Sequence, residues 1–313
     1  MKPGGPKNTH GDPHSDPEEP GGGNPGKCSE GDSNYTHDLA LLPLSVSPIP
    51  PSSRSTLQAR ANEEMEWARQ NRQQVFEAYA GLEESMDGRI VNGDLFVTLL
   101  PSVYSNPQLV HTLDLADMNY LAVDLYEASV ARNSSTGANT VVAMVGAAGI
   151  GKSTRAKELL EKHAGQVNTV LDSNGANWLA LLEAINVATR KGCNVDILYV
   201  GGDVAGAVSR TVSRSKADSR VVPSKDQAFL HRAAPINFLR AIEEIRQEGI
   251  GFAAYDARNQ CFSDDMAALA TSDLNDPINN LAGITSILKE SFHVQQLEPD
   301  AQRAFLSAEE EQP

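Results

Sequence analysis

Basic residues are scarce in this chain, which has 26 lysines and arginines against 41 aspartates and glutamates and a formal net charge of −15. A protein that binds long nucleic acids needs lysine and arginine to neutralise phosphates, so this balance argues against broad nucleic-acid binding. A local basic pocket stays open, because net charge does not describe how charges cluster. The charge balance therefore disfavours a nucleic-acid partner.

Cysteine is rare too, with Cys28, Cys193 and Cys261 scattered along the sequence. They form no CxxC pair, which disfavours a disulfide framework or a zinc site and favours a reducing compartment. No apolar run approaches the ~20 residues of a membrane span, and the N-terminus lacks the charged start and apolar core of a secretory signal peptide. We expect a cytoplasmic protein with no membrane partner, with export as a translocated effector without a cleaved signal as the alternative.

The residue pattern divides the 313 residues into four parts. Residues 1–54 are rich in proline, glycine and acidic residues, which predicts a disordered leader and linker. Residues 55–137 carry apolar side chains at helical spacing, which predicts a helical N-terminal segment. Residues 138–306 alternate between strand and helix patterns, and residues 307–313 form an acidic tail that we expect to fray.

Short apolar runs rich in β-branched residues predict the strands, at residues 140–146, 168–172, 194–201 and 250–257. Helical patterns separate these runs. This order predicts an α/β fold of the P-loop NTPase or kinase type, with a parallel sheet covered by helices on both faces. Ligands of such sheets bind at the carboxyl ends of the strands.

One stretch at such a strand end, GAAGIGKS at residues 146–153, fits the pattern GxxxxGK[ST]. Glycines let the loop turn tightly and bring backbone N–H groups against phosphate oxygens, and the following helix adds its positive N-terminal end. Lysine and serine at the end of the motif would reach the phosphates of ATP and hold Mg²⁺. The predicted nucleotide-binding residues are Gly146, Gly149, Ile150, Gly151, Lys152, Ser153 and Thr154.

Asp172 ends the strand that follows the helix of this loop. A carboxylate there can take a proton from an acceptor hydroxyl or join Ser153 in binding Mg²⁺, and it can equally cap the next helix. Arg210, Arg214 and Arg220 cluster in an otherwise acidic protein, and arginines neutralise the charge of a transferring phosphate. Surface solubility is the alternative for the arginines. We predict that Asp172 and the three arginines are catalytic and that Ser153 and Asp172 are metal ligands.

Four other polar or aromatic residues have simpler interpretations. We expect His231 to be a packed or surface histidine and Trp178 to make a core or cap contact. Asp203 is expected to cap a helix, and Asp256 is at most a residue that orients a loop.

The loop, the strand ending in Asp172, the arginine-bearing helix and the stretches RVVPSKDQAFLHRAAPINFLRAI and FAAYDARN together resemble the zeta toxin-like kinases, over roughly residues 138–262. The best markers are the loop and the R-x-x-P turn formed by Arg220 and Pro223. The resemblance implies an enzyme that moves the γ-phosphate of ATP to a hydroxyl of a nucleotide-containing small molecule. Zeta toxins phosphorylate UDP-N-acetylglucosamine, and similar effector kinases of plant-pathogenic bacteria phosphorylate NAD.

Carried over by position, the resemblance implies that Lys152 and Ser153 hold ATP and Mg²⁺ and that Arg220 contacts the transferring phosphate. A second family arginine corresponds to Arg210 or Arg214, and the sequence does not choose between them. The resemblance also implies a protein partner such as an antitoxin or a chaperone.

The sequence departs from the family at one position, because Asn174 stands where zeta toxins tend to carry the catalytic aspartate. Either Asp172 does that work, or the alignment is shifted, or the substrate differs. Two other functions therefore stay open. One is a nucleotide-binding interaction protein without transferase activity, and the other is a 5′-hydroxyl polynucleotide kinase, which the net charge disfavours.

Overall fold

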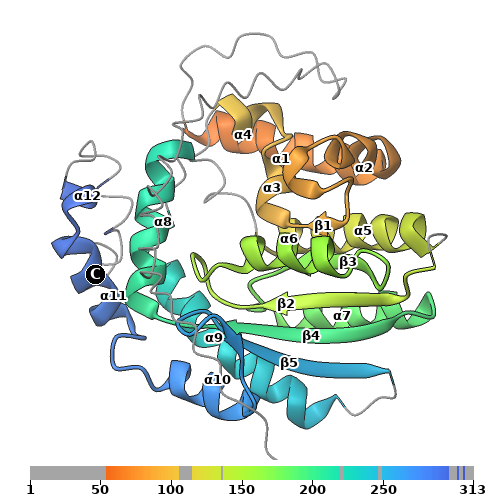
Figure 1. Cartoon of the computed structure of the whole chain (residues 1–313). Helices are drawn as coiled ribbons and strands as arrows, with labels where there is room; N and C mark the ends of the chain where they lie inside the picture. The colour runs from red at the N-terminus through yellow and green to blue at the C-terminus, as the bar shows by residue number, and fades with distance from the viewer. Residues whose placement is uncertain are drawn as a thin grey trace, which may run out of the picture. The chain divides into compact units, whose positions relative to one another are not determined.

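The computed structural model describes residues 54–105, 115–134, 137–218, 222–245 and 249–295, together with residues 302 and 306 (Figure 1). The predicted acidic tail, nearly all of the predicted leader, and Arg220 lie outside these residues. Across the described ranges, no helix combines the length and the apolar character needed to cross a membrane.

Six strands of the described residues form one sheet, in the order β1-β3-β2-β4-β5-β6. Neighbouring strands are parallel except β5 and β6, which pair in antiparallel fashion. The predicted α/β class is confirmed, the predicted parallel sheet is parallel except at β6, and the four predicted strands are β2 to β5. The bounds are β1 (Ile90–Val91), β2 (Thr140–Val145), β3 (Val167–Asp172), β4 (Asn194–Gly201), β5 (Ile250–Asp256) and β6 (Cys261–Phe262).

Helices precede, connect and follow the strands. Those before β2 are α1 (Arg54–Gln70), α2 (Arg72–Ala80), the 3₁₀ turn η2 (Glu83–Ser85), α3 (Gly93–Val97), α4 (Pro101–Ser105) and α5 (Leu115–Asn133). Those after β2 are α6 (Lys152–Lys162), α7 (Trp178–Arg190), α8 (Val204–Asp218), α9 (Ser224–Glu244), α10 (Met266–Leu274), α11 (Leu281–Glu290) and α12 (Phe292–Gln295).

Alternating side chains of β2 are buried on opposite faces of the sheet, as the two-residue period of a strand requires. Val141, Ala143 and Val145 belong to the hydrophobic cluster that α5, α7 and α9 cover. Val142 and Met144 belong to a second cluster, which α6 and α8 cover. Helices therefore shield both faces of the sheet, which explains why β2 is apolar at every position after Thr140.

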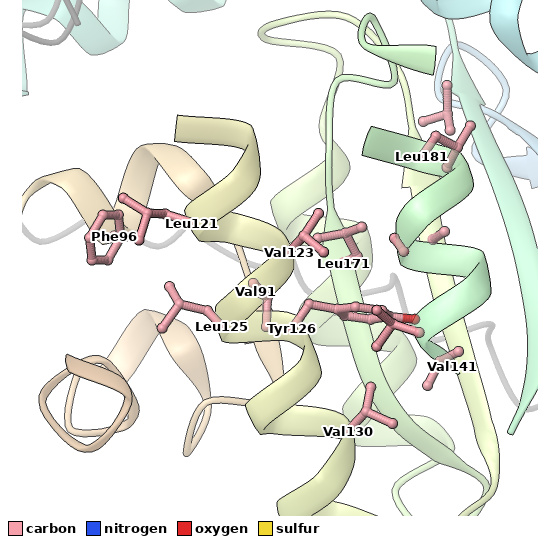
Figure 2. Packing of buried hydrophobic residues seen from close by; sticks show 14 of the residues in the cluster. Val91, Phe96, Leu121, Val123, Leu125, Tyr126, Val130, Val141, Leu171 and Leu181 are labelled. Carbon is pink, nitrogen blue, oxygen red and sulfur yellow. The ribbon is translucent and has the colours of Figure 1, made fainter. Parts of the chain in front are cut away.

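Helix α5 lies between the N-terminal helices and the sheet (Figure 2). Leu121 lies beside Phe96 of α3, whereas Val123 and Tyr126 lie on the side of Leu171 in β3. All five side chains are buried in one continuous core. The segment at residues 55–137 thus shares a core with the parallel sheet.

The same segment also contributes a strand, which the sequence pattern does not predict. Ile90 and Val91 of β1 pair with Val170 and Leu171 of β3. The helical prediction for residues 55–137 therefore needs the correction that a two-residue strand interrupts the helices and extends the sheet. The segments before and after the predicted domain boundary near residue 138 share this core and this sheet. The boundary itself stays a prediction.

Candidate functional site

Three parallel strands end at the same edge of the sheet, and the predicted site residues follow those ends. The loop at residues 146–151 joins β2 to α6, Asp172 is the last residue of β3, and Gly201 ends β4. Because these strands are neighbours in register, their carboxyl ends bring the loop, Asp172 and Gly202 together. This edge is where parallel α/β sheets bind their ligands.

At two positions of the loop after β2, glycine is the one residue that fits. A Cβ atom at Gly146 would lie 2.6 Å from the carbonyl oxygen of Val200, and one at Gly149 would lie 2.2 Å from that of Ala207. Gly149 also has a φ of 71°, in the left-handed region that costs other residues conformational energy. The backbone of the loop is therefore held tightly against β4 and α8.

Helix α6 begins directly after the loop, at Lys152. Gly151 is its N-cap residue, with a φ of 104°, and no side chain caps the helix there. The N–H groups in the first turn of a helix lack intrahelical acceptors and favour an anion. The loop and the start of α6 can thus present backbone donors to the same anionic ligand.

Ser153 and Asp172 meet at this edge. The Ser153 hydroxyl donates to Oδ2 of Asp172 over 2.6 Å, and Nδ2 of Asn92 donates to the same oxygen over 2.9 Å. Asp172 is 5% exposed, and its other oxygen, Oδ1, has no hydrogen-bond partner among the described residues. A buried carboxylate oxygen without a donor is costly, which fits an atom that binds a cation or accepts a proton when a ligand is present.

Lys152 is half-buried, and its Nζ donates to the carbonyl oxygen of Ala147 over 2.9 Å, so the side chain folds back over its own loop. Burial lowers the pKa of Lys152, the carboxylates of Asp172 and Asp94 oppose that shift, and the charge of Arg214 adds to it. An anionic ligand beside the amine would favour its charged form. The site therefore holds a lysine whose charged form is stabilised when an anion binds.

Two of the three predicted arginines lie on α8, which packs against the loop. Nε of Arg210 donates to the carbonyl oxygen of Gly149 over 2.7 Å. Arg214 is exposed one helical turn further on, and its charge acts on Lys152. Arg220 lies outside the described residues, so its predicted role stays a prediction.

The remaining predicted residues of the loop differ in exposure. Ile150 is buried and packs in the cluster under the loop, which anchors the loop to the sheet. Thr154 is exposed in the first turn of α6. Their expected part in binding a nucleotide would therefore come from the backbone of Ile150 and from either the backbone or the side chain of Thr154.

The residues given simpler interpretations have structural partners. Asp203 accepts hydrogen bonds from the backbone N–H groups of Ala205 and Gly206 at 3.1 and 2.9 Å, as a helix cap does. Asp256 accepts from the backbone N–H of Arg258 over 2.9 Å, which orients the turn after β5. Trp178 lies under the guanidinium of Arg240, 4.4 Å from the ring centre. Asn174 accepts from the Ala176 N–H over 2.9 Å and so stabilises a backbone turn.

His231 is the packed histidine that the sequence analysis expects, but its position next to the loop was not foreseen. It is 4% exposed and lines a cavity large enough for about one water molecule, together with Ala147, Ile150 and Asn279. Burial, assisted by the charge of Lys152, lowers the pKa of His231 to about 4. Nε2 of His231 and Oδ1 of Asn279 have no hydrogen-bond partner among the described residues.

Asn92 is the site residue that the sequence analysis missed. It lies 80 residues before Asp172 and reaches it only because β1 pairs with β3. A two-residue strand has no detectable period, so no local pattern marks Asn92.

Within the described residues, no group of three or more histidine, cysteine, aspartate or glutamate side chains could hold a metal ion. An ion held by Ser153 and Asp172 would therefore share its other ligands with a bound molecule and with water.

Comparison with known proteins gives no relative, since no family model and no curated protein matches the chain. The resemblance to the zeta toxin-like kinases therefore stays a hypothesis that depends on the residues described above.

Proposed function

We propose that the chain is an ATP-dependent kinase that transfers the γ-phosphate to a hydroxyl of a nucleotide-containing small molecule. The observation that carries the proposal is the contact between the Ser153 hydroxyl and Asp172, 2.6 Å long, directly after Lys152 at the carboxyl edge of a parallel sheet. This places a hydroxyl, a carboxylate and a lysine at the end of a glycine loop. P-loop NTPases use these groups in phosphoryl transfer, with the lysine on the β- and γ-phosphates and with Mg²⁺ held by the hydroxyl and a carboxylate.

The residues fit ATP and Mg²⁺. Gly146 and Gly149 keep side chains out of a loop whose backbone runs close to β4 and α8. Mg²⁺ is usually held by one or two carboxylates with substrate phosphates and water, which matches a site where the Ser153 hydroxyl and Oδ2 of Asp172 lie 2.6 Å apart. When bound, ATP supplies the phosphoryl group and Mg²⁺ offsets the charge of its phosphates.

Each charged side chain has a role in this proposal. Lys152 would bind phosphate oxygens, and Arg210 and Arg214 would neutralise charge that develops on the transferring group. Asp172 would accept the proton of the acceptor hydroxyl on Oδ1 while Ser153 holds Oδ2. UDP-N-acetylglucosamine and NAD are the two acceptors that the family resemblance favours.

One observation favours a second function. Asn174, at the position where the resemblance places a catalytic carboxylate, uses its side-chain oxygen to stabilise the turn to Ala176. A protein that binds ATP without transferring phosphate, and that acts through a protein partner, would not need a carboxylate there. Binding of an antitoxin or a chaperone, and delivery of the chain as an effector, are further proposals. They depend on which of the two functions the chain has.

A product screen by mass spectrometry tests the proposal. The protein would be incubated with ATP and Mg²⁺ beside UDP-N-acetylglucosamine or NAD, in parallel with Lys152→Ala, Asp172→Asn and the surface control Asp264→Asn. We expect one phosphoryl adduct with the unchanged protein and with Asp264→Asn, and none with the other two variants. ATP binding without an adduct on either acceptor would contradict the kinase proposal for these acceptors and favour the binding protein.

A further inference from the structure

The pairing of β1 with β3 sets Asn92 beside Asp172. Ile90 is opposite Val170 and Val91 is opposite Leu171 in a parallel register. The next residue of each strand is the polar one, and Nδ2 of Asn92 donates to Oδ2 of Asp172 over 2.9 Å. The pairing of the edge strand therefore places the side-chain amide of Asn92, from the N-terminal segment, next to the carboxylate of Asp172.

The amide of Asn92 is fixed in one orientation. Its oxygen, Oδ1, accepts from the Leu95 N–H over 3.2 Å and caps α3. Because an amide oxygen can only accept and an amide nitrogen can only donate, the nitrogen is the group turned toward Asp172.

Tyr79 of α2 holds the backbone of the same residue. Its hydroxyl accepts from the Asn92 N–H and donates to the Ile90 carbonyl oxygen, both over 2.9 Å. Tyr79 is fully buried, and burial raises the pKa of its hydroxyl well above the ordinary value. The hydroxyl therefore keeps its proton and its donor role, and Asn92 is held through its side chain and its backbone.

Two donors thus converge on one oxygen of Asp172, one from Asn92 and one from Ser153. A carboxylate with both donors on Oδ2 cannot rotate without losing them, and Oδ1 is left without a protein donor among the described residues. We propose that Asn92 is the positioning residue of this site, which holds Asp172 so that Oδ1 is kept for the acceptor hydroxyl. This inference rests on the proposed kinase function.

The proposal also gives the N-terminal segment a role. Asp94 is exposed two residues beyond Asn92, and its carboxylate acts on Lys152. The turn from β1 into α3 therefore brings polar groups toward both Asp172 and Lys152. Residues 54–133 contribute one wall of the site in this account, in addition to their share of the core.

Asn92 could instead serve α3 alone, as a helix cap, and its variants must separate the two roles. Asn92→Ser keeps a cap oxygen of similar strength but has no amide nitrogen to reach Asp172. Asn92→Asp keeps the shape and the cap, removes the donor and sets a second carboxylate against Asp172. Asn280→Ser is the matched control, because Asn280 caps α11 through the Gly283 N–H over 2.9 Å.

The experiment measures kcat, the KM for ATP and thermal unfolding of the full chain and these three variants, with the acceptor that the product screen identifies. We expect Asn92→Ser to lower kcat by ~10-fold to 100-fold, the value of one hydrogen bond to a charged group, with little change in KM. Asn92→Asp should lower kcat further. Asn92→Ser should unfold at a temperature close to that of Asn280→Ser, which should keep the unchanged kcat, whereas the like charges of Asn92→Asp should lower its unfolding temperature.

Equal kcat values for Asn92→Ser and the unchanged protein would overturn the inference and leave the proposed function standing. A loss of kcat matched by a large loss of thermal stability, absent in Asn280→Ser, would overturn it in favour of a structural role. An unchanged protein that transfers no phosphate would contradict the proposed function itself, and that result appears in the arm without any substitution.

Discussion

The Ser153 hydroxyl donates a hydrogen bond to the Asp172 carboxylate over 2.6 Å, and this contact joins the start of α6 to the end of β3. It links the glycine loop to the next strand of the sheet. A ligand that binds the Ser153 hydroxyl therefore acts on Asp172 as well, because the hydroxyl is bonded to its carboxylate.

Gly149→Ala is expected to destabilise the loop. The new Cβ would lie 2.2 Å from the Ala207 carbonyl oxygen, and the residue would have to keep a φ of 71° or shift the backbone. Strain of this kind costs about 1–3 kcal/mol before the steric overlap is added. Urea unfolding should show a loss in the free energy of unfolding above that range, and ATP affinity should fall as well.

Gly192→Ala is the control for that substitution. Gly192 has a φ of 76°, but a Cβ atom there would meet nothing within 4 Å. It should lose only the conformational part, about 1 kcal/mol. Equal losses in the free energy of unfolding for the two variants would show that the close approach of α8 does not constrain the loop.

The buried His231 should make stability depend on pH. Burial and Lys152 lower its pKa to about 4 from an ordinary value near 6.5, so between these pH values the unfolded chain binds a proton that the folded chain does not. Stability from this group is complete above about pH 6.5 and is lost as the pH falls toward 4, by about 3 kcal/mol in all. His231→Gln should flatten this part of the stability curve measured by urea unfolding at several pH values.

His163→Gln is the matched control, because His163 is exposed at the end of α6. It should leave the slope between pH 4 and 6.5 unchanged. A slope that survives in His231→Gln would assign the pH dependence to groups other than His231.

Asp273→Ala should destabilise the end of β4. The buried carboxylate accepts from the Tyr199 hydroxyl over 2.8 Å, from the Gly202 N–H over 3.1 Å and from Nη2 of Arg258 over 2.7 Å. Its removal leaves two buried donors without an acceptor, at a cost of about 3 kcal/mol in the free energy of unfolding. Asp264→Ala, on an exposed loop, should change that free energy by less than about 0.5 kcal/mol, and a similar loss in both would refute this role.

The sequence predicts the strands that lie in the middle of the sheet and misses those at its edges. β2 to β5 have six to eight residues each and are rich in apolar and β-branched side chains, a composition that indicates strands of a buried sheet. β1 and β6 have two residues each, and they form only because longer strands offer them backbone partners. Pairing of that kind is decided by contacts between distant parts of the chain, which a local pattern does not contain.

The residues of the candidate site also fall into two groups, those that the sequence predicts and those that it misses. Lys152 and Ser153 belong to one short motif, and Asp172 follows a predicted strand, so the sequence places all three at one edge of the sheet. Asn92 and His231 approach that edge from elements whose position depends on the packing of the whole core. Their side chains carry no local mark, since a capping asparagine and a buried histidine occur in many helices.

Titration calorimetry of Mg²⁺-ATP tests the central claim, that the loop at residues 146–153 is a nucleotide-phosphate site, most directly. It would compare the unchanged protein with Lys152→Ala and with Lys162→Ala, a control at the exposed end of α6. The account predicts saturable binding by the unchanged protein and the control, and an affinity about 10-fold to 100-fold lower for Lys152→Ala, because one charge-assisted contact is lost. No binding by the unchanged protein, or equal affinity in all three, would contradict it.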